Sequence, residues 1–93
     1  MARTAFLITI IGRVQRVGFR AFVRERALEL GLDGWVRNRG DGSVEITVIG
    51  EPHQVDLLME QCGQGPALAD VEDITLQGAD DDGTVGFHER ATL

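Results

Sequence analysis

The chain has 93 residues, of which 43% are hydrophobic, a size and composition that indicate one folded domain over residues 1–93 and exclude a disordered tail. A net charge of −6 disfavours anionic surfaces, so we expect neither nucleic acid nor membrane as a partner. No apolar run approaches the roughly 20 residues that span a bilayer, and a single cysteine with no evident signal peptide favours a cytoplasmic location.

Positive charge is concentrated in the first part of the chain. Residues 1–39 hold eight arginines and three acidic residues, a net charge of +5, whereas residues 40–93 hold one arginine and twelve acidic residues, a net charge of −11. A small basic site on an acidic body suits a small anion better than a polyanion.

The first two predicted elements are a strand and a helix joined by a short loop. Thr4–Ile11 is apolar on both faces, which favours a central strand. Residues 21–30 continue a helical spacing of apolar residues, and Gly31 is placed to end the helix. Gly12–Arg20 therefore forms the loop, with Arg20 where the helix begins.

This loop is a candidate site for an anion. The first turn of a helix has backbone N–H groups without partners and the positive end of the helix dipole, which together favour phosphate. Arg13, Arg16 and Arg20 add guanidinium groups, whose planar donors match two phosphoryl oxygens at once. The alternative is a surface turn that is basic by chance, because a short motif alone is weak evidence.

The middle of the chain predicts a hairpin and a second helix. Strands over residues 32–39 and 43–49 flank the turn Gly40–Gly42, and the half-polar alternation of the second strand predicts one sheet face against the helices and one in water. The second helix begins at Pro52 and ends between residues 63 and 66. Cys62 lies on its apolar stripe, which indicates a buried structural thiol.

Two weaker strands, over residues 71–76 and 85–92, complete the prediction. We interpret the acidic turn Asp80–Gly83 between them as a solvated hairpin tip, because its spacing does not fit a calcium loop. The first four strands and the two helices follow the order β-α-β-β-α-β, which predicts an α+β, ferredoxin-like sandwich, with a four-stranded antiparallel sheet and two helices on one face.

The sequence lacks the patterns of covalent or metal-dependent catalysis. His53 and His88 show neither metal-ligand nor triad spacing, and no Gly-Lys-Ser/Thr follows the loop, so we expect no metal and no cofactor. Phosphoryl transfer to water needs only positioning and electrostatic stabilisation. The amide of Asn38, at the end of the second predicted strand, can orient a water because it both donates and accepts. The alternative is a residue chosen for entry into the turn.

Two blocks of this sequence resemble the signatures of the acylphosphatase family. The blocks are Gly12-Arg13-Val14-Gln15-x-Val17-Gly18-Phe19-Arg20, and Ala27-Leu28-Glu29-Leu30-Gly31-Leu32-x-Gly34-Trp35-Val36-Arg37-Asn38 followed by Asp41-Gly42-x-Val44-Glu45. Gly65-Pro66, Ala69-x-Val71 and Phe87 fit the family's C-terminal half, so the resemblance covers nearly the whole chain. It implies a ferredoxin-like fold and hydrolysis of acyl phosphates to carboxylate and inorganic phosphate, without metal or cofactor.

The resemblance also implies roles for particular residues. By position, the phosphate-binding arginine of the family falls on Arg20 and the water-positioning asparagine on Asn38, which makes these two the catalytic candidates. The backbone amides that cradle the phosphoryl oxygens fall on the loop residues before Arg20. These are Gln15, Arg16, Val17, Gly18 and Phe19.

Two residues depart from the family pattern. Arg16 stands where the family usually has glycine, which strains the loop if that position needs a positive φ. We favour a milder interpretation, in which the Arg16 amide stays in place and its side chain points to solvent and adds positive charge at the mouth. Glu89 stands where an apolar residue is common, and we expect it to fray the last strand, with an effect on stability more than on catalysis.

Three other functions fit parts of this pattern. An RNA-binding module of the same fold is disfavoured because residues 43–49 hold no aromatic side chain for base stacking. A non-catalytic phosphate- or anion-binding regulatory domain fits the loop but leaves Asn38 without a purpose. A domain of a larger carbamoyl-phosphate-using protein is a further alternative, although the length favours a free-standing enzyme. The absence of a surplus apolar stripe predicts a monomer.

Overall fold

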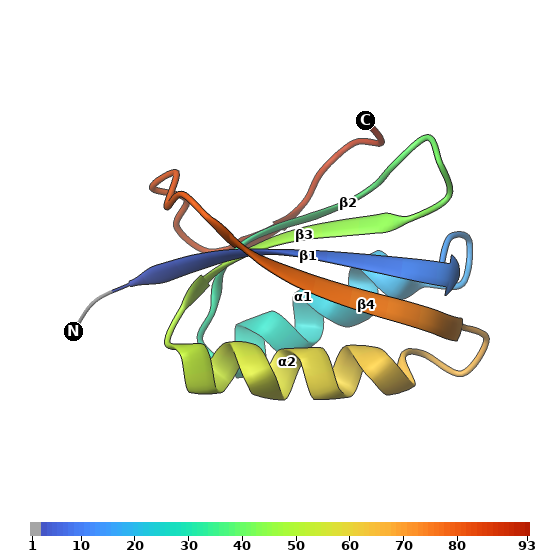
Figure 1. Ribbon diagram of the computed structural model, residues 1–93, viewed down its shortest axis with the longest axis horizontal. Helices are drawn as coiled ribbons and strands as arrows, with labels where there is room; N and C mark the ends of the chain where they lie inside the picture. The colour runs from blue at the N-terminus through green and yellow to red at the C-terminus, as the bar shows by residue number, and fades with distance from the viewer. Residues whose placement is uncertain (1–2) are drawn as a thin grey trace.

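The computed structural model describes residues 3–93 and shows one twisted sheet with two helices packed on one of its faces (Figure 1). The elements are β1 (Thr4–Arg13), α1 (Phe19–Glu29), β2 (Asp33–Asn38), β3 (Val44–Gly50), α2 (Pro52–Gln64), β4 (Asp70–Ala79) and β5 (Phe87–Glu89). The strand order is β4-β1-β3-β2-β5, and the first four strands pair antiparallel. The predicted ferredoxin-like α+β architecture is confirmed.

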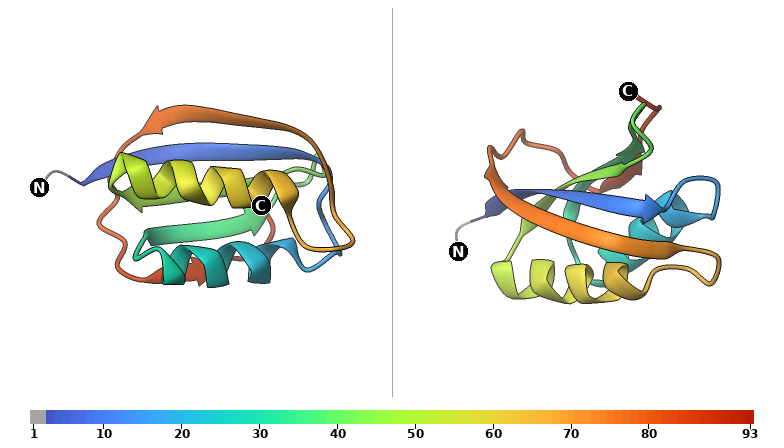
Figure 2. Two further views of the ribbon diagram at one scale, coloured as in Figure 1. Left: turned by 90° about the horizontal axis from the view of Figure 1, so that it is seen from below. Right: turned by 45° about the vertical axis from the view of Figure 1, so that its right-hand side comes forward.

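The sheet has five strands in the described residues instead of the predicted four. β5 pairs parallel with β2, with Phe87 opposite Gly34 and Glu89 opposite Val36. Because β4 and β5 lie at opposite edges, the interpretation of Asp80–Gly83 as a hairpin tip is wrong. The segment between these strands crosses the end of the sheet from one edge to the other (Figure 2). Alternation within a strand carries no information about which edge the strand joins.

The crossing segment is fixed by side-chain contacts with the start of the sheet. Arg3 donates to both carboxylate oxygens of Asp81 at 2.9 and 3.0 Å, and also to Asp33 at 2.9 Å. The indole Nε1 of Trp35 donates to Asp82 at 3.3 Å. The acidic turn thus has partners inside the molecule and is not simply solvated.

The core fills the space between the sheet and the helices. Ile8 and Ile10 of β1, Val23 and Ala27 of α1 and Leu58 of α2 are all completely buried, as the apolar spacing predicts. Cys62 is also buried, and burial raises the pKa of its thiol to about 12, so the thiol stays protonated at neutral pH. The prediction of a buried structural thiol is confirmed.

The outer face of β3 is buried too, so the prediction that this face meets water is wrong. Glu45 is 6% exposed and Thr47 is 7% exposed. Glu45 accepts hydrogen bonds from Arg37 at 2.8 Å and from Arg39 at 2.9 Å, and the guanidinium of Arg37 lies 4.7 Å from the ring centroid of Trp35. Long arginine stems and one indole cover this polar side of the central strand.

The loop that leads to α1 is shorter than the sequence predicts, because β1 continues to Arg13 and α1 begins at Phe19. The pairing of β1 with β4 shifts register between Ile11 and Gly12. Gly12 has a φ of 134°, and a Cβ there would overlap the carbonyl oxygen of Asp70. The bulge re-aims the chain as it leaves the sheet, so residues 14–18 reach the start of α1.

Candidate active site

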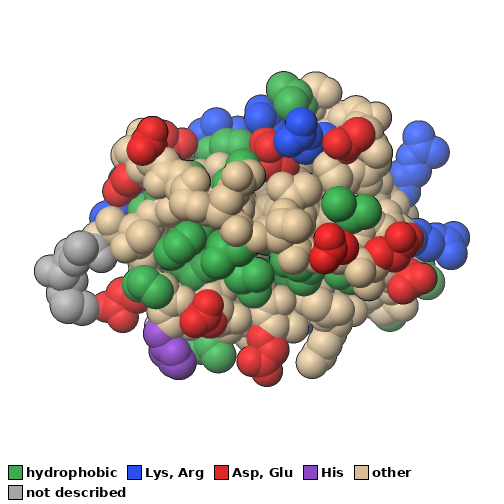
Figure 3. Space-filling model, viewed as in Figure 1, with side chains coloured by type: hydrophobic (Ala, Val, Ile, Leu, Met, Phe, Trp, Pro, Cys, Tyr) green, Lys and Arg blue, Asp and Glu red, His purple; other side chains and the backbone are tan. Residues whose placement is uncertain are grey.

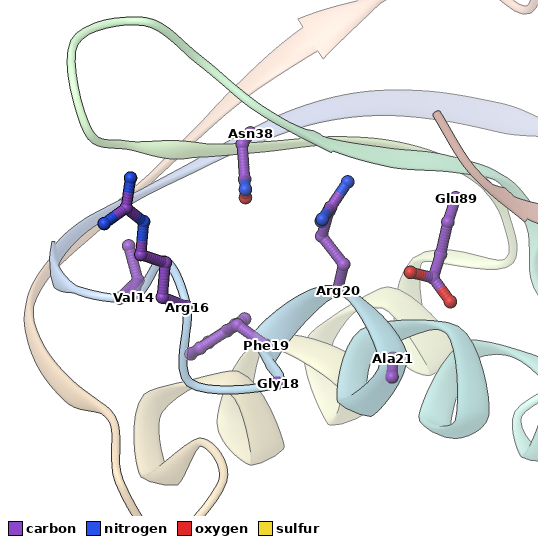
Figure 4. Close-up of a pocket in the computed structure, with 8 residues that line it drawn as sticks. All are labelled: Val14, Arg16, Gly18, Phe19, Arg20, Ala21, Asn38 and Glu89. Atoms are coloured by element: carbon purple, nitrogen blue, oxygen red, sulfur yellow. The ribbon is translucent and has the colours of Figure 1, made fainter. Parts of the chain in front are cut away.

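A cavity of about 130 Å³ opens at the N-terminal end of α1 (Figure 4). Its wall combines the loop, the first turn of α1, the end of β2 and the edge strand β5. The lining residues are Val14, Arg16, Gly18, Phe19, Arg20, Ala21, Asn38 and Glu89. The fold therefore brings Arg20 and Asn38 to one cavity, together with the predicted loop residues Arg16, Gly18 and Phe19.

The start of α1 is open to an anion. Gly18 precedes the helix in a left-handed conformation, with a φ of 80°, no side chain makes a capping hydrogen bond, and the first turn holds no acidic residue. The backbone N–H groups of this turn are therefore not capped by a side chain, and no carboxylate offsets the helix dipole there. This is the arrangement that phosphate-binding helix ends share.

Arg20 rises from the first turn of α1 into the cavity. Figure 4 shows its guanidinium between Asn38 and Glu89. Its Nη1 donates to the backbone carbonyl of Arg90 at 3.4 Å, and it forms no ion pair within residues 3–93. The remaining donors of the fork are available for an anion.

Asn38 is the last residue of β2, and its side chain points into the cavity from the side opposite α1 (Figure 4). Its backbone carbonyl accepts a hydrogen bond from the amide of Leu93 at 3.1 Å, and its backbone pairs with Val44 of β3. The backbone is thus held on both sides, while the side-chain amide faces the space where a ligand would lie.

Two of the predicted loop residues turn their side chains away from the cavity. The amide of Gln15 donates to the carbonyl oxygens of Arg39 at 2.8 Å and Ser43 at 2.9 Å, which ties the loop to the turn between β2 and β3. Val17 packs against the hydrophobic core. Only the backbone groups of these two residues are in a position to serve the cradle.

Arg16 has both features considered from the sequence, a backbone with positive φ and a side chain at the mouth of the cavity. Its φ is 62°, and within the described chain it is the one residue other than glycine with a positive φ. A left-handed conformation costs a residue with a Cβ about 1–2 kcal/mol. The Arg16 side chain is exposed at the rim of the cavity, where it adds positive charge.

Glu89 is a lining residue whose place at the cavity the sequence does not indicate. It reaches the cavity because β5 pairs with β2, the strand that carries Asn38. The local sequence holds no signal for this position, since it depends on a pairing between strands far apart in the chain. The wall is otherwise basic or neutral, so Glu89 is its one acidic side chain.

Within residues 3–93, no group of three or more His, Cys, Asp or Glu side chains is arranged to hold a metal ion. In the same range, no helix has the length and apolar character needed to cross a membrane. Independence from metal and cofactor stays a prediction, which chelation tests directly.

An uncapped helix start, an arginine in its first turn and a facing amide lie together on an α+β, ferredoxin-like domain, an arrangement suited to a phosphate-type anion. The chain matches the acylphosphatase family over residues 6–89 and belongs to that family. It is 47% identical over 85 residues to an acylphosphatase of Acidiphilium cryptum, a match that covers 91% of this chain and 93% of the relative. An acylphosphatase of Thermus thermophilus is 46% identical over 83% of this chain and 88% of its own.

Solved structures show the same architecture. The crystal structure of an acylphosphatase from Bacillus subtilis matches with a TM-score of 0.90 and 34% identity, over 96% of this chain and 99% of that one. Full-length HypF, crystallised in a phosphate- and nucleotide-bound form, matches with a TM-score of 0.91 and 27% identity. The HypF match covers 98% of this chain but 12% of that one, so the same fold also occurs as a part of a larger protein.

Proposed function

We propose that this chain hydrolyses the carboxyl–phosphate bond of acyl phosphates, with Arg20 and Asn38 as its catalytic residues. The observation that carries the proposal is the convergence of Arg20, Asn38 and the uncapped start of α1 on one small cavity. Membership of the acylphosphatase family supports the same activity. The substrate partner is a small acyl phosphate, and the products are a carboxylate and inorganic phosphate.

The phosphoryl group lies in the loop from Gln15 to Arg20 in this proposal. The backbone N–H groups of the loop and the first turn, together with the guanidinium of Arg20, neutralise charge on the three non-bridging oxygens. The side-chain amide of Asn38 holds a water in line with the bond that breaks. The water attacks phosphorus as the P–O bond to the carboxyl group breaks, and a phosphoryl oxygen takes the proton of the water.

No general acid is required for this reaction. The leaving group is a carboxylate, a weak base that departs without protonation. The absence of a histidine from the cavity wall is consistent with this chemistry. Rate acceleration then comes from positioning and from the aimed donors, which are already in place before the substrate enters.

The runner-up function is a non-catalytic phosphate- or anion-binding regulatory domain of the same fold. A domain that only binds needs the loop and Arg20 but has no use for an amide aimed at the cavity from the opposite side. Relatives matched over nearly their whole length carry the name acylphosphatase, which favours the enzyme.

Hydrolysis of benzoyl phosphate by the purified chain, with a chelator present, tests the proposal. We expect turnover that survives the chelator and falls by about 10²–10³-fold or more in Arg20→Ala, because a charge and two aimed donors are lost together. Arg20→Lys keeps the charge without the planar fork and is expected to fall between the two. No turnover by the unaltered chain, with inorganic phosphate still bound, would establish the regulatory alternative.

Asn38→Ala separates binding from catalysis. We expect a large fall in kcat with little change in the inhibition constant of inorganic phosphate, because the amide acts on the water and not on the phosphoryl group. Asn38→Asp is a matched variant of the same shape that replaces the donor with an anion beside the phosphoryl site. Near-normal kcat in Asn38→Ala would show that another group positions the water.

We also propose that residues 1–93 form a single acylphosphatase-like domain that acts as a monomer in the cytoplasm, without cofactor, metal, nucleic acid or membrane partners. The net charge of −6 supports the exclusion of polyanions. Sedimentation equilibrium measures the oligomeric state, and a mass other than that of one chain would overturn the monomer. Which acyl phosphate is the physiological substrate depends on the residues at the rim of the cavity, which would contact the acyl group.

A further inference from the structure

We propose that Arg16 makes this site selective for small acyl phosphates whose acyl group carries a second negative charge, and that Glu89 opposes this selectivity from the other end of the opening. The inference rests on the proposed hydrolysis and concerns the part of the substrate that leaves as carboxylate. It assigns to Arg16, and to the acid at the opposite end of the cavity, a role in choosing the substrate.

The acyl group has to meet the rim of the cavity. A volume of about 130 Å³ is well below the roughly 300–1,000 Å³ of pockets that enclose a whole drug-sized ligand. With the phosphoryl group and the attacking water in place, most of an acyl group extends past the opening. Charges at the rim therefore act on the acyl group.

Arg16 is an unneutralised cation at that rim. Its side chain is exposed, and it takes part in no side-chain hydrogen bond or ion pair within the described residues, whereas Arg37 of β2 and Arg39, the residue after β2, both bind Glu45. The residue also retains a left-handed backbone that glycine would adopt without strain. A strained residue at a ligand site is often kept for what its side chain does there.

Glu89 places a negative charge at the end of the opening opposite Arg16. Figure 4 shows Arg16 and Glu89 on opposite sides of Arg20 and Asn38, so the rim is positive at one end and negative at the other. Glu89 is exposed and forms no ion pair with another described residue. An anionic acyl group is attracted towards Arg16 and repelled from Glu89, and a cationic acyl group meets the reverse.

Three benzoyl phosphates of one shape test this selectivity. They are the unsubstituted compound, a 4-carboxy compound and a 4-trimethylammonio compound, which present a neutral, an anionic and a cationic acyl group. The quantity compared is the kcat/KM of each charged substrate divided by that of the neutral one. Comparing this ratio between variants cancels the intrinsic reactivity that each substituent confers.

We expect Arg16→Asn to lower the ratio for the anionic substrate about three- to fivefold, the range of an exposed ion pair. Asparagine tolerates the left-handed backbone, so this variant removes the charge and keeps the conformation. Arg16→Lys retains the charge and most of the ratio. Glu89→Gln raises the ratio for the anionic substrate and lowers it for the cationic one, by similar factors.

Arg24 supplies the control for overall charge. It is an exposed cation one turn further along α1 that does not line the cavity, and Arg24→Gln is expected to leave both ratios unchanged. Raising the salt from 0.05 to about 0.5 M should shrink the ratio in the unaltered chain but not in Arg16→Asn, because exposed charges are screened.

Failure of the selectivity proposal can be distinguished from failure of the proposed hydrolysis. If Arg16→Asn changes kcat/KM by the same factor for all three substrates, Arg16 serves only the phosphoryl group and the selectivity proposal is overturned. If the unaltered chain fails to hydrolyse the neutral compound, the proposed hydrolysis itself is overturned. A selectivity ratio that moves equally in Arg24→Gln assigns the effect to net charge and also overturns the role of the rim.

Discussion

At the scale of single residues, the shape of the loop depends on Gln15, whose side chain lies outside the cavity. Its amide binds the carbonyl oxygens of Arg39 and Ser43 on the turn between β2 and β3. That turn is itself fixed by Asp41, which accepts hydrogen bonds from the backbone N–H and the hydroxyl of Ser43. The loop proposed to hold the phosphoryl group and the strand end that carries Asn38 are thereby joined into one unit.

This arrangement predicts a difference between two substitutions of Gln15. Gln15→Ala removes two hydrogen bonds and should cost about 1–3 kcal/mol in the free energy of unfolding. Gln15→Glu is nearly isosteric but places a carboxylate against two carbonyl oxygens, so it should cost more and also raise KM. Urea unfolding and benzoyl phosphate kinetics measure both effects. Gln77→Glu on the exposed edge strand β4 is the control, and equal stability of the two Gln15 variants would contradict the tether.

The sequence predicts some residues of the site better than others. Arg20 and Asn38 fall in motifs whose spacing fixes their surroundings, so the structure could be anticipated there. The loop glycine position filled by Arg16 could also be recognised, since it departs from a pattern. Glu89 could not be placed, because its approach to the cavity follows from the parallel pairing of β5 with β2 and from nothing in its own neighbourhood.

At the scale of elements, β5 and the residues after it support the site through contacts with Arg20 and Asn38. Phe87 is 2% exposed and seats the strand on the core. Beyond it, the amide of Arg90 donates to the carbonyl of Val36 at 2.8 Å, the carbonyl of Arg90 accepts from Arg20, and the amide of Leu93 donates to Asn38. One short edge strand and the segment after it therefore contact both proposed catalytic residues.

Phe87→Ala should consequently affect stability and catalysis together. Removing a buried aromatic ring costs about 3–5 kcal/mol, and loosening β5 should lower kcat under conditions where the chain stays folded. Leu58→Ala in α2 is the matched control, since it removes a fully buried side chain with a comparable cost from an element that contributes no residue to the cavity wall. If both variants reduce kcat equally at equal fraction folded, β5 does not brace the site.

Element type was more predictable than element placement. Apolar periodicity located both helices and the strands that form β1 to β4, because burial on one face leaves a trace in the sequence. The edge position of β5 was not predictable from periodicity, and neither was the covering of β3 by Trp35 and Arg37. Both depend on long side chains and on pairings that are set only when the whole sheet assembles.

At the scale of the whole molecule, basic and acidic groups are unevenly placed. Figure 3 shows basic side chains projecting from the end where β1 runs into the loop, and acidic side chains scattered over α2 and β4. Several carboxylates are nonetheless bound internally. Hydrogen bonds from Arg3 hold the pKa of Asp81 below its usual value of 3.8, and those from Thr84 and Ser43 lower the pKa values of Asp82 and Asp41.

These pKa shifts determine whether the free energy of unfolding rises or falls in acid. A carboxyl whose pKa is lower in the folded than in the unfolded chain stabilises the fold fully above the unfolded pKa, here 3.8, and loses that contribution as the pH falls through the folded pKa. The free energy of unfolding should therefore be steady from neutral pH to about pH 5 and then decline. Only below the folded pKa values, which lie under 3.8, do the protonated carboxyls no longer favour the folded chain.

Arg3→Ala tests this at the contact between the crossing segment and the start of the sheet. We expect the variant to be less stable than the unaltered chain at pH 6, because Asp81 and Asp33 lose a shared guanidinium. The gap should narrow as the pH falls below about 4, since Arg3 contributes little to the unaltered chain once Asp81 is protonated. Urea unfolding from pH 6 to pH 2.5 measures the gap, with Arg24→Ala as a control for lost positive charge. A gap that stays constant across this range would assign the effect of Arg3 to packing of its stem and not to its carboxylate partners.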